Sequence, residues 1–447
     1  MRRSLILATT LAAVTTQLIV AAPSRATTVL TPITRSGAQF LKGTASFVPR
    51  GNNYLTKNAE GSPFNATAYT TPSGAPVPAY DAAIAHNQLA NMKLSGYNVV
   101  RVRLHTVEIY DDSGTPGAAD PFATALDQTY LDNLADFVNF AADQGIYTMI
   151  VADFIPATST GAGFTSKYAP PGSAPYAGVF GLRNAYYLYM PMIDGQKTYV
   201  TDLLRGLLAR GVSLSNLFSV NLSNEQHFDG MAGSDGFPLS LTSGQVSTQD
   251  GGTYDMSSTL QKQQMMDNNL RQWANKMWVA IRTVAPTTMI GVGFASPSEG
   301  VQTPVTPPPA PAVAKPIIRT LGAYAALTEL IDVHGYPVGG ETPQQIMDKI
   351  QRTTTGDRKP IVMGEFGSYK PSTPSAYVAG AQLRQWAIDS CHTSGEKWNG
   401  WLAWTWDSDD RATGGSAVDF WTVRESYDGH SGVVNSYVAP VAWSTFC

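Results

Sequence analysis

The chain has 447 residues, of which 43% are hydrophobic and 14% are charged. This length is sufficient for one large hydrophobic core or for two domains. The formal net charge of -4 at pH 7 provides no basic surface for nucleic acid or for an anionic membrane, so we expect neither as a partner.

The N-terminus has the pattern of a secretory signal peptide. Met1–Arg3 is positively charged, a mostly apolar stretch follows, and Ser24 and Ala26 are small residues at the -3 and -1 positions of a cleavage site. A membrane anchor is the alternative, but threonine and glutamine residues interrupt the apolar stretch. We predict a signal peptide over residues 1–26 and a secreted protein, extracellular or periplasmic, over residues 27–447.

The chain contains two cysteines, Cys391 and Cys447. In an exported protein a disulfide between them would tie the C-terminus to the end of a late predicted helix. Two free thiols are the alternative, and the sequence alone does not decide between them.

Apolar strand-like segments alternate with segments of helical periodicity through the rest of the chain. The predicted strands cover residues 47–55, 98–104, 147–154, 217–223, 288–295, 330–334, 360–364 and 398–406. A predicted helix precedes each strand except the first, over residues 80–94, 130–144, 198–210, 260–284, 317–329, 343–352 and 376–393.

Strands that alternate with helices must pair in parallel, because each crossover needs a helix to return the chain to the same end of the sheet. No Gly-x-Gly-x-x-Gly turn follows the first strand, which argues against an open dinucleotide-binding sheet. The proline-rich stretch 303–311 lies within one strand–helix unit, so we interpret it as a loop rather than an interdomain linker. The sequence predicts an α/β fold, a single-domain (β/α)8 TIM barrel.

Two glutamates stand at the carboxyl ends of apolar strands. Asn224 and Glu225 follow the fourth predicted strand, and Glu365 follows the seventh. Barrel enzymes build their active sites at this end of the strands. Glycoside cleavage requires one protonated and one ionised carboxyl group; a separation of roughly 5 Å gives retention of configuration, and a wider one gives inversion. We predict that Glu225 and Glu365 face each other across a sugar-binding cleft.

Side chains alternate between the two faces of a strand. The two glutamates should therefore share a face with the residues that precede them at every second position. Those residues are Asn221 and Ser223 for Glu225, and Ile361 and Met363 for Glu365.

Three further motifs accompany the two glutamates. Gly96–Arg101 leads into the second predicted strand, Asp332–Tyr336 spans the end of the sixth, and Gly400–Trp404 lies in the eighth. Together they resemble glycoside hydrolase clan A, most closely family 5, the cellulase and mannanase family, over about residues 40–410. The resemblance implies a (β/α)8 barrel that hydrolyses β-glycosidic bonds with retention of configuration and needs no cofactor or metal.

The resemblance also implies a role for each matching residue. Glu225 would be the acid/base and Glu365 the nucleophile, while Asn224 would hydrogen-bond the 2-hydroxyl of the sugar. Arg101 and Tyr336 would both donate hydrogen bonds to the nucleophile, and the arginine would keep it ionised.

Three more residues are expected to contact substrate. The resemblance implies that His334 lines the site near the acid/base and that Trp404 stacks against a sugar ring. His105 ends the second strand and lies an even number of residues after Arg101. Its side chain should therefore point to the same inner face, and we expect it to line the cleft. The chain departs from the family at Gln226, where a proline is usual, and at Asp153, where a histidine is usual.

The sequence therefore predicts a secreted, monomeric, retaining glycoside hydrolase whose partner is a β-linked glycan or oligosaccharide. Two alternatives stay open: a transglycosylase that remodels glycans, and a non-catalytic glycan-binding protein on the same barrel. No Gly-x-Ser-x-Gly or His-Glu-x-x-His motif supports a serine hydrolase or a zinc peptidase. The sugar, the linkage and endo or exo action are not specified by these residues.

Overall fold

The computed structural model describes residues 27–55, 64–65, 68–70, 76–77, 79–104, 126–153, 168, 176, 178–304, 315–336, 340–353, 358–406, 420–423 and 432–442. The predicted signal peptide, His105 and Cys447 lie outside these residues. Within them, no helix has both the length and the apolar character that crossing a bilayer requires. Cys391 is disulfide-bonded, and the sequence contains one other cysteine.

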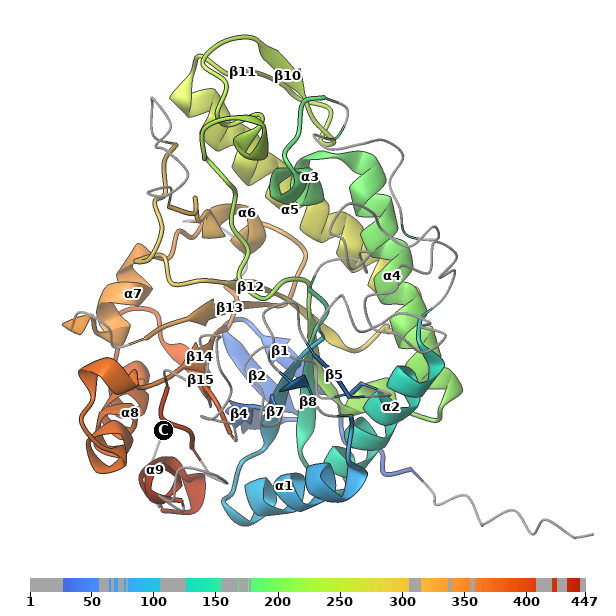
Figure 1. The fold of residues 1–447 in the computed structure, drawn as a ribbon, viewed down its shortest axis with the longest axis vertical. Helices are drawn as coiled ribbons and strands as arrows, with labels where there is room; N and C mark the ends of the chain where they lie inside the picture. The colour runs from blue at the N-terminus through green and yellow to red at the C-terminus, as the bar shows by residue number, and fades with distance from the viewer. Residues whose placement is uncertain are drawn as a thin grey trace, which may run out of the picture.

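Eight parallel strands close into a barrel (Figure 1). In chain order they are β4 (Arg50–Asn53), β7 (Val99–Arg103), β8 (Tyr147–Val151), β9 (Leu217–Asn221), β12 (Met289–Phe294), β13 (Leu330–His334), β14 (Ile361–Phe366) and β15 (Trp398–Ala403). Each strand pairs with the next, and β15 pairs with β4 to complete the circle. The predicted (β/α)8 barrel is confirmed, and β9 and β14 are its fourth and seventh strands.

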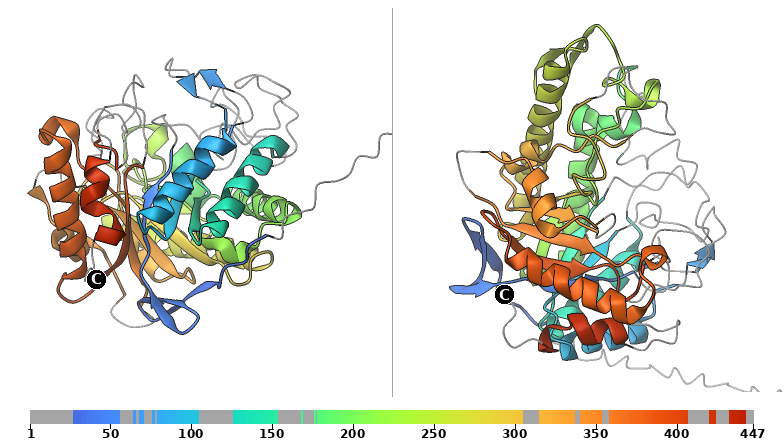
Figure 2. Two further views of the ribbon diagram at one scale, coloured as in Figure 1. Left: turned by 90° about the horizontal axis from the view of Figure 1, so that it is seen from below. Right: turned by 90° about the vertical axis from the view of Figure 1, so that its left-hand side faces the viewer.

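Helices surround the barrel (Figure 2). They are α1 (Ala82–Leu94), α2 (Gln128–Asp143), α3 (Leu182–Leu188), α4 (Met190–Ala209), α5 (Thr259–Arg282), α6 (Thr320–Tyr324), α7 (Pro343–Lys349), α8 (Ala376–Cys391) and α9 (Val433–Val438). Short polar side chains accept hydrogen bonds from the first turn of five of them, which satisfies otherwise unpaired N–H groups. These N-caps are Asp81, Asp127, Ser258, Thr342 and Ser375.

Two predicted elements differ in the structure. The strand predicted over 47–55 is divided, because Pro49 separates β3 (Ala45–Phe47) from β4 and cannot donate a ladder hydrogen bond. The helix predicted over 317–329 shrinks to α6, because the backbone of Ile317 is extended and bridges to Phe228.

An antiparallel sheet that the sequence did not predict covers the amino-terminal end of the barrel. It consists of β1 (Ile33–Ser36), β2 (Gln39–Lys42) and β3. Phe40 packs edge-on against Phe218 inside the barrel, with ring centroids 5.1 Å apart. The apolar cluster that joins this sheet to the barrel interior contains Ile33, Phe40, Val99, Tyr147, Met149, Phe218, Met289, Leu330, Val362 and Leu402.

The segment between β9 and α5 extends away from the barrel. Figure 1 shows β10 (Gln245–Ser247), β11 (Thr253–Asp255), α3 and one end of α5 above the strands. A second small hairpin, β5 (Tyr69–Thr70) and β6 (Pro76–Val77), lies near α2 in the same view.

A bulge in β14 changes which side chains face the barrel interior. Val362 pairs with Asp332, but Glu365 pairs with His334, so β14 has one more residue than β13 over this interval. Val362 belongs to the interior cluster, whereas Ile361 and Met363 pack in the outer core with the helices. The prediction that Ile361 and Met363 share a face with Glu365 is therefore wrong, because the bulge resets the alternation just before the glutamate.

Candidate active site

A fully buried arginine organises the carboxyl end of the barrel. Nη1 of Arg101, on β7, donates to Oε1 of Glu365 at 2.6 Å and to Oδ1 of Asn53 at 2.8 Å. Nη2 donates to Oδ1 of Asn224 at 2.8 Å and lies 3.1 Å from Nε2 of His334. One guanidinium thus connects the ends of four strands, as expected for a planar group with five donors.

Glu365 accepts hydrogen bonds on both carboxylate oxygens. Besides the contact with Arg101, the hydroxyl of Tyr336 donates to Oε2 at 2.6 Å. Burial and the negative charge of Glu365 raise the pKa of Tyr336 well above its ordinary value, so its hydroxyl remains a donor. The side chain of Glu365 is only 4% exposed. The two contacts predicted for Glu365 are present in the structure.

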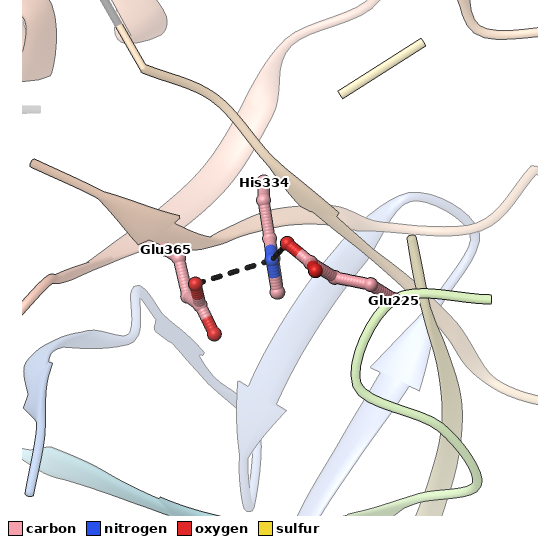
Figure 3. Close-up of side chains that lie close together, drawn as sticks. All are labelled: Glu225, His334 and Glu365. Atoms are coloured by element: carbon pink, nitrogen blue, oxygen red, sulfur yellow. Dashed lines mark hydrogen bonds and ion pairs between the residues drawn. The ribbon is translucent and has the colours of Figure 1, made fainter. Parts of the chain in front are cut away.

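The imidazole of His334 lies between the two glutamates (Figure 3). Its Nδ1 is 2.8 Å from Oε1 of Glu225 and 3.3 Å from Oε2 of Glu365. Burial raises the pKa of Glu225, but the hydrogen bond and charge of His334, helped by Arg103 and Arg101, outweigh burial and lower it to about 2. The side chain of Glu225 is 39% exposed, so this glutamate is the accessible member of the pair.

Burial and the neighbouring carboxylates have opposite effects on the pKa of His334. Burial lowers its pKa, but Glu365, Asp332 and Glu225 together raise it to about 10. The contact with Arg101 opposes this rise, because an arginine N–H can only donate and needs the lone pair on Nε2. In both the charged ring and the neutral ring that accepts from Arg101, Nδ1 carries a proton that points toward the glutamates.

Asn224 is fixed by its side chain and by its backbone. Its Oδ1 accepts from Arg101, which leaves the Nδ2 group able to donate to a ligand. Its backbone N–H donates to Oδ1 of Asp153 at 3.3 Å, and the other oxygen of Asp153 pairs with Arg103 at 3.1 Å. Asp153, which stands where the family usually has histidine, therefore holds the Asn224 backbone in place.

Gln226 occupies the position at which proline was expected. Its backbone N–H donates to the carbonyl of Gly293 at 2.8 Å, a hydrogen bond that proline could not make. A Cβ atom on Gly293 would lie 2.4 Å from the carbonyl oxygens of Ser223 and Asn224. Glycine at this position lets the segment that carries Glu225 lie directly against β12.

Trp404 lies beside the catalytic end of the barrel in a small apolar cluster. Leu55 is buried with it, and Tyr336 and Phe420 pack against them. Trp404 is 7% exposed, and its Nε1 has no hydrogen-bond partner among the described residues. The described residues thus place Trp404 beside Tyr336, whereas His105 lies outside them.

Three groups at this site could each offer one metal-ligand atom. Atoms of Glu225, His334 and Glu365 lie within 4.8 Å of one another. The distances from Nδ1 of His334 to the two carboxylates, 2.8 and 3.3 Å, are those of one N–H shared between two acceptors. We therefore interpret the group as a hydrogen-bonded acid–base cluster and assign no metal to it.

Two supporting residues were missed in the sequence. Asn53 accepts from Arg101 and donates through Nδ2 to the carbonyl of Gly364 at 2.9 Å, which ties β4 to the residue before Glu365. Asp332 lies on β13 two residues before His334 and is fully buried. For Asp332 the available signal was a carboxylate within an otherwise apolar stretch of β13, whereas β4 has the sequence Arg-Gly-Asn-Asn and gives no such contrast for Asn53.

The fold and the site together define a (β/α)8 barrel with paired glutamates at the carboxyl ends of its fourth and seventh strands. No protein-family model matches the chain, and no curated protein is similar to it at a significant level. Its similarity to known proteins therefore lies in the fold.

Several solved structures share this fold. An exo-β-1,4-mannosidase from Opitutaceae bacterium strain TAV5 matches 91% of this chain at 16% identity and a TM-score of 0.55, and the match spans 61% of the mannosidase. An endo-1,4-β-mannanase from Rhizomucor miehei matches 92% of this chain and 99% of its own length, also at 16% identity and a TM-score of 0.55. A β-glucosidase matches 89% of this chain and 98% of its own length at 12% identity and a TM-score of 0.52.

Proposed function

We propose that this protein is a retaining glycoside hydrolase that cleaves β-linked glycans. The observation that carries the proposal is the short spacing of Glu225 and Glu365, which lie on opposite sides of His334 with a carboxylate oxygen of each within 4.8 Å of the other. Retaining enzymes hold their two carboxyl groups roughly 5 Å apart, whereas inverting enzymes need about 6.5–9.5 Å to admit a water molecule. The short spacing favours double displacement.

In the first step, an oxygen of Glu365 forms a bond to the anomeric carbon as the bond from that carbon to the leaving oxygen breaks. Glu225 transfers its proton to the leaving oxygen, and a glycosyl ester remains on Glu365. In the second step, Glu225 removes a proton from water, the water oxygen bonds to the anomeric carbon, and the ester bond breaks. Both glutamates return to their starting states, and the β configuration is retained.

Glu225 must hold a proton for the first step, although His334 outweighs burial and lowers its pKa to about 2 in the free protein. The two groups interact strongly enough to titrate as a pair, so the proton needed by the acid is one that the pair holds jointly. A glycan that covers the exposed part of Glu225 excludes water from its ionised form, which favours the proton on the carboxyl group.

The remaining contacts support these steps. Arg101 and Tyr336 orient Glu365 toward the anomeric carbon. Asn224 has its Nδ2 group available to bind a sugar hydroxyl, and Trp404 offers an aromatic wall to the C–H face of a sugar. We include His105 in the cleft on the basis of its sequence position.

We further propose that the protein is secreted after removal of residues 1–26 and acts as a monomer on a mannan-type or glucan-type substrate. The support for the substrate class is that structures sharing the fold include a β-1,4-mannosidase, a β-1,4-mannanase and a β-glucosidase. A protein with this cellulase-like role in polysaccharide catabolism needs no cofactor, since both catalytic groups are side chains.

The test is hydrolysis of a panel of mannan, glucomannan, cellulose and aryl β-glycosides, with the first-released anomer identified by proton NMR. We expect the β-anomer. Glu365→Ala should lose about 10⁴-fold or more in kcat, and Glu225→Ala should lose roughly 10²–10⁴-fold, most with poor leaving groups. Azide should rescue the two variants with opposite products, an α-glycosyl azide for Glu365→Ala and a β-glycosyl azide for Glu225→Ala.

Glu396→Ala is the matched control, because Glu396 lies just before β15, at the other end of the barrel, and pairs with Arg358. It should retain wild-type activity. Undiminished hydrolysis by either active-site variant, or release of the α-anomer first, would overturn the proposal. A sugar acceptor that diverts most of the product from hydrolysis to transfer would instead favour a transglycosylase, and tight glycan binding without turnover would favour a binding protein.

A further inference from the structure

A second buried carboxylate lies beneath the site, on the same strand as His334. Oδ2 of Asp332 is 3.4 Å from Nε of Arg101 and accepts a hydrogen bond from Nδ2 of Asn221 at 2.8 Å. The same oxygen is 3.9 Å from Nε2 of His334. Arg101 therefore has one carboxylate at its Nε edge, Asp332, and another at its Nη1 edge, Glu365.

Two glycines make room for this carboxylate and its hydrogen-bond partner. A Cβ atom on Gly364 would lie 1.8 Å from Oδ1 of Asp332, and one on Gly291 would lie 2.5 Å from Oδ1 of Asn221. Gly364 immediately precedes Glu365. The absence of a side chain at Gly364 therefore lets Asp332 and Glu365 approach the same guanidinium from neighbouring strands.

Charged and titratable groups from several strands surround this cluster. Arg101 and Arg103 come from β7, His334 and Asp332 come from β13, and Glu365 comes from β14. The groups that follow strand ends are Asp153, Glu225, Glu299 and Tyr336. Carboxylates outnumber permanent cations here, so the positive charge of Arg101 is divided among several partners.

We propose that Asp332 is a positioning residue that forms an ion pair with the Nε edge of Arg101 and shares the positive charge of the guanidinium with Glu365. The inference rests on the proposed function, because it concerns the reactivity of Glu365 as a nucleophile. A guanidinium paired with Glu365 alone would attract its electrons more strongly and make the carboxylate a weaker nucleophile. With Asp332 present, Arg101 holds Glu365 in position while part of its charge is balanced elsewhere.

The direct test uses Asp332→Asn, which keeps the shape of the side chain and removes one negative charge. The histidine ring nitrogens are followed by ¹⁵N NMR against pH, with the His334 signals identified among the six histidines through His334→Gln. Besides Glu365 and Glu225, Asp332 raises the pKa of His334. Its removal should lower that pKa by about one unit or more, as expected for a unit charge at this distance in a protein interior.

The second readout is the pH profile of kcat/KM on the best substrate from the panel. Loss of one negative charge stabilises the deprotonated form of every neighbouring group, so the profile of Asp332→Asn should move toward acid. We expect kcat to fall about 10-fold or more with KM within a factor of three, because Asp332 does not contact substrate. A purely structural role would lower the rate without moving the profile.

Asp267→Asn is the matched control, since Asp267 pairs with Arg319 outside the barrel interior. It should change neither readout. If Asp332→Asn does not fold, the exchange variant Asn221→Asp/Asp332→Asn keeps one carboxylate and one amide in the pair, and should shift His334 in the same direction by less. An unshifted His334 titration in a folded variant overturns the inference.

The proposed hydrolase function and the proposed role of Asp332 can each be rejected without rejecting the other. The NMR titration needs no turnover, so a shifted His334 in a protein that hydrolyses no glycan would support the charge sharing and reject the hydrolase. Glycan hydrolysis with wild-type titration and pH profile in Asp332→Asn would support the hydrolase and reject the role of Asp332.

Discussion

The barrel interior at its amino-terminal end, next to β1–β3, is filled by apolar side chains. On β7 and β13, two residues further on, the interior side chain is charged. On β7 the change is from Val99 to Arg101, and on β13 it is from Leu330 to Asp332. Two residues of a strand span roughly 6.6 Å. The hydrophobic core and the candidate active site are thus adjacent layers of one barrel, and β7 and β13 contribute to both.

The charged layer relies on the apolar layer to keep its strands in register. Arg101, Asp332 and Glu365 are all buried, and buried charges persist only with well-placed partners. The partners meet because the strands that carry them are held in register by apolar packing one layer below. Variants in the apolar layer should therefore change stability alone, while variants in the charged layer should change activity first.

The largest effect should come from Arg101→Met, which removes the shared donor of the charged layer. Two buried carboxylates would lose their shared arginine, at a cost of roughly 3–5 kcal/mol in the free energy of unfolding, and kcat should fall by about 10³-fold or more. Urea unfolding and steady-state kinetics measure the two losses. Arg282→Met, which breaks the outer pair with Glu329, should reduce stability without reducing kcat.

Phe218→Ala should have a large effect on stability only. Its side chain is fully buried against Phe40, so truncation should cost about 3–5 kcal/mol. The molecules that remain folded should keep the wild-type kcat and pH profile. Both are measured below the melting temperature, after the concentration of functional active sites has been determined by titration. A changed pH profile would show that the two layers are not separable in this way.

His334→Ala should change the pKa of a group in the charged layer, the carboxyl of Glu225. Burial already raises the pKa of Glu225, and loss of the His334 N–H and charge removes the main opposing influence. The pKa of the Glu225 carboxyl should therefore rise from about 2, because burial is then opposed only by Arg103 and Arg101. Carboxyl ¹³C NMR, with the signal assigned through Glu225→Gln, measures the change. His334→Gln retains a donor and should give a smaller rise.

The smallest effect should come from metal removal. The short contacts among Glu225, His334 and Glu365 are satisfied by an N–H, so we expect EDTA treatment and dialysis to leave kcat within about 10% of its starting value. A loss of activity that zinc or calcium restores would contradict this interpretation of the cluster.

Most of the barrel could be predicted because its strands are buried on both faces and read as continuous apolar runs. The polar residue that ends each run also marked the site, as for Glu225 and Tyr336. The β1–β3 sheet was missed because its strands are short and mixed in character. The outward orientation of Ile361 and Met363 was missed because a bulge depends on the neighbouring strand, and sequence alternation within β14 carries no information about β13.

Asp332 and Asn53 were missed for a different reason. Each lies in a short strand, and its partner Arg101 lies on another strand. Sequence spacing shows which residues share a strand, but the partners of a buried charge are fixed only when the barrel closes. His334 and Arg101 were found because motifs carried them, not because their contacts could be derived.

The bulge in β14 has a consequence for engineering this strand. Between Val362 and Glu365 the strand tolerates no change in length, because removing one residue would restore regular alternation and turn the glutamate toward the helices. Substitutions of Met363 by other apolar residues keep the count and should be accepted. Library design here should therefore vary the amino acid at each position and keep the number of residues constant.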